Sequence, residues 1–406
     1  MHPEHPASEH KWRIDRARRT MKEEGLDALM LARNVNVFYT TGTRFVFVER
    51  DFQSSVVPQS ATIITPDDAI YCGRFSAYDT DAVGLDTSLV DTFEYYGSDN
   101  ELSLVDILKK YGIGRGDKIG TEWGQGLSLG INPITFEALR RRISTELGAQ
   151  LVDGWKTIWK MRSVKSPFEI ERMRKAVVAA ARAMERIFDF VQVGMNELDV
   201  ARKVSIFMLE EGADDVGHNQ VMGRGEGPLF LSCSALDRKI QKGYVNLDIG
   251  CRYRRYACDI NRGILLGRQP TEDEKKLYQC RRGVNEVMEK AIRPGIPMDD
   301  VLLKAKQYVQ ECGCQMQELA GGIFGGHGIG LEAHEKPYLV LSQQQPEFQN
   351  EKGKVLFETG MMFTFEVPIM LPGSDADFNV EDDIVVTDTG VENMNSTLSR
   401  ELRIKL

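Results

Sequence analysis

The sequence lacks any long apolar stretch. None of its runs approaches the ~18 consecutive apolar residues that a membrane helix requires. The N-terminal residues MHPEHPASEHKW also lack the apolar core of a secretory signal. These two absences predict a cytoplasmic protein with no membrane partner.

Basic residues are in short supply, and the cysteines follow no regular pattern. The 51 lysines and arginines are outnumbered by 60 aspartates and glutamates, which gives a formal net charge of −9. Nucleic-acid-binding proteins usually carry a basic patch or a high pI, so no nucleic-acid partner is expected. The 7 cysteines are odd in number and irregularly spaced. They therefore fit reduced thiols better than a disulfide framework.

Histidine is scarce as well, with 6 in the whole chain. A lone histidine is usually a surface residue or a core residue with its hydrogen bonds satisfied. His327 and His334, however, share the motif HGIGLEAHEKP with Glu335 and Pro337, and this grouping favours a functional role. The role of His218 is left open.

The 406 residues are enough for two domains, and 42% hydrophobic with 27% charged residues is typical of a globular protein. Up to about residue 150, strand patterns alternate with helix patterns, which favours an α/β layer. A boundary is expected near 153–167, where Ser166 and Pro167 suit the N-cap and first position of a long helix, with Glu169 nearby. Further helix patterns cover residues 169–191, 197–211, 272–291 and 298–312.

Two aspartates stand in the stretch VNLDIGCRYRRYACDINRG, residues 245–263. Alternating apolar residues place Asp248 on the face opposite to Val245 and Leu247, and a basic segment turns the chain before Asp259. As a β-hairpin, this segment puts two carboxylates side by side on adjacent strands. Close, buried carboxylates repel each other, and a cation between them removes that cost. The alternative is a hairpin with two solvated acids.

Three later residues favour the metal site: His327 in GGHGIG, Glu366 in MMFTFEVPIM and Glu381 in FNVEDDIVVT. Each lies in its own apolar strand pattern or glycine-rich turn. Asp, Asp, His, Glu, Glu in this order forms the ligand set of a two-metal site, and such ligands suit Mn²⁺, Co²⁺, Fe²⁺ or Zn²⁺. Such a site acidifies a bridging water and presents it as hydroxide.

With these five residues, and with HGIG followed by HE-x-P, the chain resembles the pita-bread-fold metallohydrolases, which include methionine aminopeptidase, aminopeptidase P, prolidase and creatinase. The resemblance implies an α+β fold, with a pita-bread catalytic domain at 156–406 preceded by a smaller α/β creatinase-type N-terminal domain at 1–155. The segment VNVFYTTG, residues 35–42, resembles an early strand and turn of this family. A homodimer is also implied, in which the N-terminal domain closes the partner's active site.

The resemblance further implies how the ligands are shared between two divalent ions. Asp248, Asp259 and Glu381 would bind one ion, and Asp259, His327, Glu366 and Glu381 the other, so that Asp259 and Glu381 bridge. Glu366 would also be the catalytic proton acceptor and donor, and His334 would contact the substrate.

The function expected from this resemblance is hydrolysis of an amide or peptide bond in a small molecule or short peptide, of the Xaa-Pro dipeptidase or aminopeptidase P type. A metal-bridging hydroxide would attack the carbonyl carbon. One alternative is a non-peptidase of the same fold, such as a dimethylsulfoniopropionate lyase, ectoine hydrolase or creatinase. Another is a binding protein that has lost catalysis, although such relatives normally lose metal ligands.

Several departures from the peptidase pattern bear on the substrate. The further histidine that these peptidases carry before the first metal aspartate is absent, and Phe230, a candidate substrate contact, lies near its expected place. The arginine often found two positions before the last glutamate is replaced by Asn379. GPLFLSC, residues 227–233, resembles the lyase branch, and GCRYRRYAC, residues 250–258, resembles the ectoine hydrolases. Arg252–Arg255 could be a solvated hairpin tip or could face a partner's pocket.

Overall fold

The computed structural model describes residues 5–42, 60–73, 92–95, 100–124, 133–223, 234–319 and 321–406. The chain forms two compact units, residues 1–162 and residues 163–406. None of the described helices combines the length and the apolar character that a membrane crossing requires.

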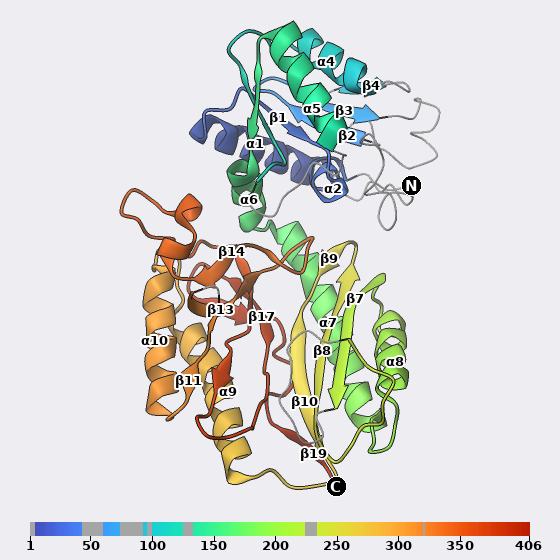
Figure 1. The fold of residues 1–406 in the computed structure, drawn as a ribbon, viewed down its shortest axis with the longest axis vertical. Coiled ribbons are helices and arrows are strands. Elements are labelled where there is room, and N and C mark those ends of the chain that lie inside the picture. The colour runs from blue at the N-terminus through green and yellow to red at the C-terminus, as the bar shows by residue number, and fades with distance from the viewer. Residues whose placement is uncertain are drawn as a thin grey trace. The chain divides into compact units, whose positions relative to one another are not determined.

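The first unit is built on a mixed six-stranded sheet with strand order β4-β3-β2-β1-β5-β6 (Figure 1). β1 is antiparallel to β2 and parallel to β5. The strands are β1 (Ala28–Leu31), β2 (Ser60–Ile64), β3 (Ala69–Gly73), β4 (Thr92–Tyr95), β5 (Lys118–Thr121) and β6 (Gln150–Asp153). The helices of this part of the chain are α1 (Ala7–Glu23), α2 (Asn34–Thr41), α4 (Asn100–Lys110), α5 (Pro133–Arg142), which continues into a π-helical turn (Ile143–Leu147), and α6 (Trp155–Ser163).

The strand expected over residues 35–42 is wrong, because these residues form helix α2. The hydroxyl groups of its threonines find acceptors within the helix. Thr40 and Thr41 donate their hydroxyl protons to main-chain carbonyls one turn back, Asn36 O at 2.9 Å and Val37 O at 2.7 Å. Gly42 ends the helix in the left-handed conformation, as a C-terminal glycine commonly does.

In its described residues, the second unit contains two large sheets, one two-stranded sheet and two pairs of helices. Its helices are α7 (Pro167–Phe190), α8 (Glu197–Glu210), α9 (Glu272–Ala291) and α10 (Met298–Glu311). One sheet has the order β19-β10-β8-β7, with β9 paired to β8, and consists of β7 (Asp215–Gly223), β8 (Gly243–Tyr253), β9 (Tyr256–Ala257), β10 (Ile260–Leu266) and β19 (Arg403–Lys405).

The other large sheet has the order β12-β13-β15-β17-β18, with β14 paired to β13. It consists of β12 (Glu318–Leu319), β13 (Gly322–Gly328), β14 (Glu335–Val340), β15 (Met362–Phe365), β17 (Asp382–Val386) and β18 (Val391–Asn393), while β11 (Gln315–Met316) pairs with β16 (Ile369–Met370) separately. Short 3₁₀ turns cover Ser342–Gln344 and Pro346–Phe348. Figure 1 shows the two large sheets lying between α7 and α8 on one side and α9 and α10 on the other.

The start of α7 matches the local sequence expectation. The hydroxyl of Ser166 accepts a hydrogen bond from the amide of Glu169, and the Glu169 carboxylate accepts one in return from the amide of Ser166. This reciprocal pair is a capping box, and Pro167 occupies the first helical turn, where its missing amide proton costs nothing. The predicted N-cap is therefore confirmed.

The two large sheets of the second unit meet at a short main-chain bridge. Asn261 of β10 pairs with Glu381, which directly precedes β17. The amide of Glu381 donates to Asn261 O at 3.0 Å. Through this bridge, the residues around Asp259 and those around Glu381 are held next to each other, although they belong to different sheets.

Candidate metal centre

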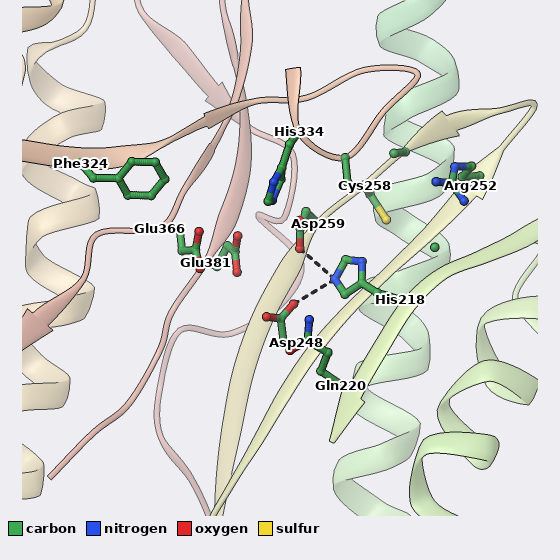
Figure 2. Close-up of a pocket in the computed structure, with 13 residues that line it drawn as sticks. His218, Gln220, Asp248, Arg252, Cys258, Asp259, Phe324, His334, Glu366 and Glu381 are labelled. Atoms are coloured by element: carbon green, nitrogen blue, oxygen red, sulfur yellow. Dashed lines mark hydrogen bonds and ion pairs between the residues drawn. The ribbon is translucent and has the colours of Figure 1, made fainter. Parts of the chain in front are cut away.

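All five predicted ligands lie together in the second unit. Asp248 is on β8, Asp259 directly precedes β10, His327 is on β13, Glu366 directly follows β15, and Glu381 directly precedes β17. Ligand atoms of His327, Glu366 and Glu381 lie within 4.8 Å of one another, as do those of Asp259, His327 and His334. Four of the five ligands line a cavity of about 560 Å³ (Figure 2).

The hairpin interpretation of the two aspartates is confirmed. β8 and β10 are antiparallel, with Asp248 paired to Asn261 and Ile249 paired to Ile260. Asp259 is therefore one step beyond the paired segment, diagonal to Asp248. Both side chains point into the same cavity in Figure 2.

His327 reaches the centre because of the glycines that surround it. At Gly326 φ is +140°, and a β-carbon built there would lie 1.8 Å from the carbonyl oxygen of Thr364 on β15. Only glycine permits this close approach of two strands. The Nδ1 atom of His327 lies 3.0 Å from Gly328 O, which leaves Nε2 facing Asp259 at 3.9 Å from Oδ2.

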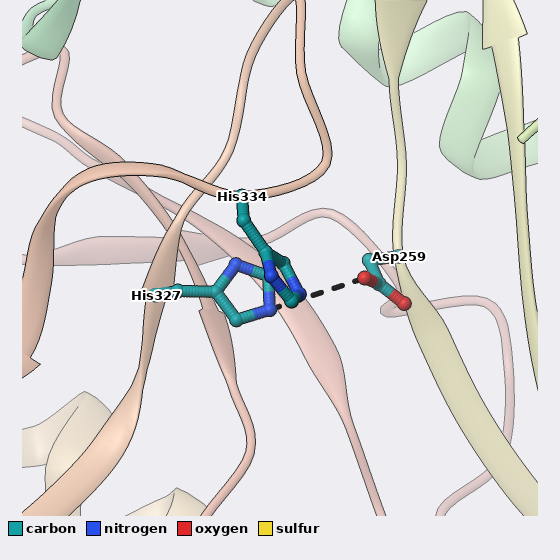
Figure 3. Close-up of side chains that lie close together, drawn as sticks. All are labelled: Asp259, His327 and His334. Carbon is teal, nitrogen blue, oxygen red and sulfur yellow. Dashed lines mark ion pairs between the residues drawn. The ribbon is translucent and has the colours of Figure 1, made fainter. Parts of the chain in front are cut away.

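His334 is an exposed histidine beside the buried His327. Its ring centroid lies 3.9 Å from that of His327, with the planes tilted by 56°. Figure 3 shows the two rings and the Asp259 carboxylate converging from separate segments. His334 thus combines contact with the candidate ligands and access to the cavity, which it also lines.

Crowded acidic groups dominate the electrostatics. Burial, with the nearby carboxylates of Asp259 and Asp248, raises the pKa of Glu366 to about 8. Burial and the carboxylates of Asp259 and Glu366 hold the pKa of Glu381 well above its ordinary range. Four carboxyl groups in one buried place cannot all ionise without added positive charge.

Histidines supply part of that charge. Burial opposes ionisation of Asp259, but His218 and His327 outweigh it and lower the pKa of Asp259. Burial also disfavours a charged His218, yet the carboxylates of Asp259 and Asp248 raise its pKa to about 10. His327 behaves oppositely, because burial lowers its pKa to about 4 and keeps its imidazole neutral, as a metal ligand must be.

The carboxylate of Asp383 forms hydrogen bonds next to the candidate ligands. It accepts a hydrogen bond from the amide of Asp259 at 3.0 Å and another from the hydroxyl of Thr364. Arg262 donates to the carbonyl oxygen of Glu381 at 2.7 Å and is paired with Asp382 at 2.5 Å. These contacts fix the backbone at two of the candidate ligands.

The donor set fits divalent ions. His327 Nε2 and Glu381 Oε2 are fully buried, and neither has a hydrogen-bond partner within the described residues. Buried polar atoms without a partner are uncommon and costly, and a cation would satisfy both. Carboxylates with one neutral imidazole suit Mn²⁺, Co²⁺, Fe²⁺ or Zn²⁺.

Comparison with protein families shows the family of the chain. The model of "Metallopeptidase family M24" matches residues 171–388, and that of "Creatinase/Prolidase N-terminal domain" matches residues 13–164. The chain belongs to metallopeptidase family M24. The predicted fold class is confirmed: a creatinase-type N-terminal domain is followed in the chain by a pita-bread catalytic domain.

Individual M24 relatives match over nearly the whole chain. The uncharacterized peptidase YqhT of Bacillus subtilis is 26% identical over 382 residues, which cover 93% of this chain and 96% of the relative. The Xaa-Pro dipeptidase of Pyrococcus horikoshii is 27% identical over 394 residues, 94% of this chain and 96% of that protein. The solved Xaa-Pro dipeptidase from Bacillus anthracis superposes with a TM-score of 0.76 at 23% identity, covering 97% of this chain and 99% of that one.

Two further residues line the cavity, although no sequence motif predicted a place for them there. His218 on β7 lies 2.9 Å from Asp248 Oδ1 and 3.0 Å from Asp259 Oδ1, measured from its Nε2 atom. Arg252 lines the same cavity and pairs with Asp215 at 3.5 Å, so part of the basic hairpin segment belongs to this chain's own pocket. Phe230, the candidate substrate contact, lies outside the described residues.

Asn379 stands where the resemblance leads one to expect an arginine. An arginine from helix α9 lies beside it instead. Arg281 on α9 is buried and donates to the carbonyl oxygens of Val367 and Ile369. Its guanidinium also lies 3.4 Å from Asn379 Oδ1. Helix α9, and not the segment before β17, therefore supplies a positive charge that acts on Glu366.

Proposed function

We propose that this M24 protein is a metal-dependent hydrolase that cleaves an amide or peptide bond of a small substrate, as an Xaa-Pro dipeptidase or aminopeptidase P does. The observation that carries the proposal is the convergence of Asp248, Asp259, His327, Glu366 and Glu381, from two sheets, beside the exposed His334. The cofactor we propose is a pair of divalent ions, Mn²⁺, Co²⁺, Fe²⁺ or Zn²⁺.

The bound ions would supply Lewis acidity and an activated water. Glu366 is suited to accept the proton of the attacking water at its carboxylate and to return it to the leaving nitrogen, because its side chain lines the cavity among the candidate ligands. His334 would donate a hydrogen bond to the carbonyl oxygen of the substrate, since it is exposed at the cavity. Asp383 and Arg262 would keep the ligand backbone in position.

The relatives support the proposed substrate class. Proteins named as Xaa-Pro dipeptidases match this chain over nearly its full length, whereas the lyase and ectoine hydrolase resemblances rest on short segments. One of those segments, residues 227–233, lies outside the described residues. We therefore propose the peptidase activity and no second function.

Metal analysis combined with a substrate screen tests this proposal. The screen sets Xaa-Pro dipeptides and Xaa-Pro-Xaa tripeptides against dipeptides without proline, ectoine, creatine and dimethylsulfoniopropionate. We expect about two ions per chain, cleavage of the Xaa-Pro bond, loss of activity on chelation and recovery with added metal. A protein that never takes up metal, or that turns over only a non-peptide substrate, would overturn the proposal.

A further inference from the structure

His218 stands where a ligand of the first ion would stand. Its Nε2 atom is 2.9 Å from Asp248 Oδ1 and 3.0 Å from Asp259 Oδ1, and ligand atoms of these three residues lie within 4.8 Å of one another. Metal–donor bonds of about 2.1 Å place neighbouring donors roughly 3 Å apart when they meet near right angles. The three atoms therefore have the spacing of donors that share one ion (Figure 2).

The local backbone directs His218 into the cavity. The pairing of β7 with β8 shifts register between Val216 and His218, which is the signature of a bulge. Beyond the bulge, His218 is paired with Gly250. A β-carbon at Gly250 would lie 2.3 Å from His218 Cε1, so the absent side chain makes the space that the imidazole ring occupies.

The neighbouring residue of β7 faces the other way. The side-chain Nδ2 of Asn219 donates to Ser205 Oγ at 2.6 Å and to Ala201 O at 3.2 Å, both on α8. The alternation of the strand thus gives one side chain to the cavity and the next to the helix. The direction of the His218 side chain is therefore set by its position on β7 and by its pairing with Gly250.

We propose that His218 is a direct metal ligand through Nε2, sharing with Asp248 and Asp259 the ion on the β7 side of the centre. This inference rests on the proposed two-metal function and adds one imidazole to a first ion that otherwise has only carboxylate ligands. Binding of the ion would release the proton that Asp248 and Asp259 favour on His218 in the metal-free protein. A nitrogen donor shifts a site from Mn²⁺ toward Co²⁺, Fe²⁺ or Zn²⁺. Each ion of the pair would then have one histidine ligand, His218 for the first and His327 for the second.

Cobalt-substituted protein tests the inference, with proton NMR as the deciding measurement. A histidine bound to Co²⁺ through Nε2 retains an Nδ1 proton whose resonance is strongly shifted and disappears in D₂O. We expect two such resonances in the wild-type protein and one in His218→Ala. Asn219→Ala, on the same strand but facing α8, should retain both.

Metal titration adds an independent readout. We expect one of the two ions to bind at least ~10-fold more weakly to His218→Ala, since even residues that only orient ligands change affinity ~10–100-fold. Circular dichroism would establish that the variant is folded. A wild-type spectrum with one shifted exchangeable imidazole resonance, or an identical spectrum in His218→Ala, would overturn the inference while leaving a two-metal hydrolase intact. A wild-type protein that binds no metal would overturn the proposed function together with the inference.

Discussion

At the residue scale, the side chains of the centre differ in what they would do. Buried carboxylates and the neutral His327 have the character of ligands, whereas His334 is exposed and free to meet a substrate. These roles predict different losses on substitution. A ligand change should remove the metal, and a substrate-contact change should remove turnover alone.

His334→Ala should lose turnover and keep its metal. Removal of one preorganised hydrogen-bond donor typically costs ~10²–10³ in kcat. We expect a loss of about that size in Xaa-Pro hydrolysis, with the ion content of the wild type, measured by steady-state kinetics and metal analysis on one preparation. Wild-type turnover at full metal content would show that His334 is a bystander.

Asp259→Ala should lose metal and activity together. Asp259 is expected to bridge both ions, and its carboxylate lies beside His218 and within reach of His327. We expect less than one tightly bound ion per chain and no measurable turnover. Asp388→Ala is a suitable control, because Asp388 bonds only to Thr359 on the surface in the described contacts. Two tightly held ions in Asp259→Ala would contradict the ligand assignment.

The five candidate ligands could be named from the sequence because each is tied to a short motif with its own strand pattern or glycines, and the structure brings them together. His218 could not, because its approach depends on the register of β7 against β8, which no local pattern specifies. The sequence does contain Gly250, which leaves room for the ring of His218. That relation can be recognised only when the pairing of the two strands is known. Arg281 escaped prediction for the same reason, since a helix brings it beside Asn379.

At the scale of elements, β13 determines how closely the second sheet is packed. Gly326 lets β13 approach β15, and this approach brings His327 and Glu366 together. A helix or strand prediction places both residues in strands. It does not give the separation of the strands, on which the centre depends.

Gly326→Ala should therefore disturb both folding and metal binding. We expect a loss of about 2–6 kcal/mol in the free energy of unfolding, with about 1–3 from backbone strain and about 1–3 from steric overlap with Thr364 O. Urea denaturation of the metal-loaded protein measures it.

Gly321→Ala provides the matched control on the same segment. Gly321 also has a positive φ of +81°, but a β-carbon there meets nothing within 4 Å. Its cost should be limited to the strain of the left-handed backbone, about 1–2 kcal/mol. Equal effects of the two substitutions would show that strand approach at Gly326 is unimportant.

Helices were the most predictable elements. The patterns over 169–191, 197–211, 272–291 and 298–312 correspond to α7, α8, α9 and α10. Long amphipathic repeats and end signals specify them locally. The short segment 35–42 was expected to be a strand and turn from its resemblance to the family, but it forms helix α2, in which the hydroxyls of Thr40 and Thr41 bond to carbonyls one turn back.

For the whole molecule, the cost of collecting buried acids should appear as a pH-dependent stability of the metal-free protein. Glu366 and His218 both have raised folded-state pKa values, about 8 and about 10. At pH values above the unfolded-state pKa of these groups, the folded state holds more protons than the unfolded state. The stability of the folded state therefore falls as pH rises. His327, whose pKa is lowered to about 4, acts in the opposite direction only at lower pH, below its unfolded value.

We therefore expect the Tm of chelated protein to fall between pH 7 and 8.5, and the Tm of metal-loaded protein to change less. Differential scanning calorimetry of both forms in matched buffers measures the difference. Parallel Tm profiles for the two forms would mean that bound ions do not balance this cluster of carboxylates.

We expect a homodimer, because the family resemblance implies that the N-terminal domain closes a partner's active site. Light scattering combined with size exclusion should give a mass of about twice 45.8 kDa. A fully active, stable monomer would contradict this prediction. The division into domains at 1–155 and 156–406 likewise stays a prediction.

The bridge between Asn261 and Glu381 has a consequence for how the protein matures. Asp248 and Asp259 leave the ribosome well before His327, Glu366 and Glu381, and the two groups meet only after β17 is in place beside β10. A nascent chain that stops short of β17 offers an incoming ion a half-built site. Metal should therefore bind late, after the second sheet has been translated. A chain with bound metal would be one in which the two sheets have packed together correctly.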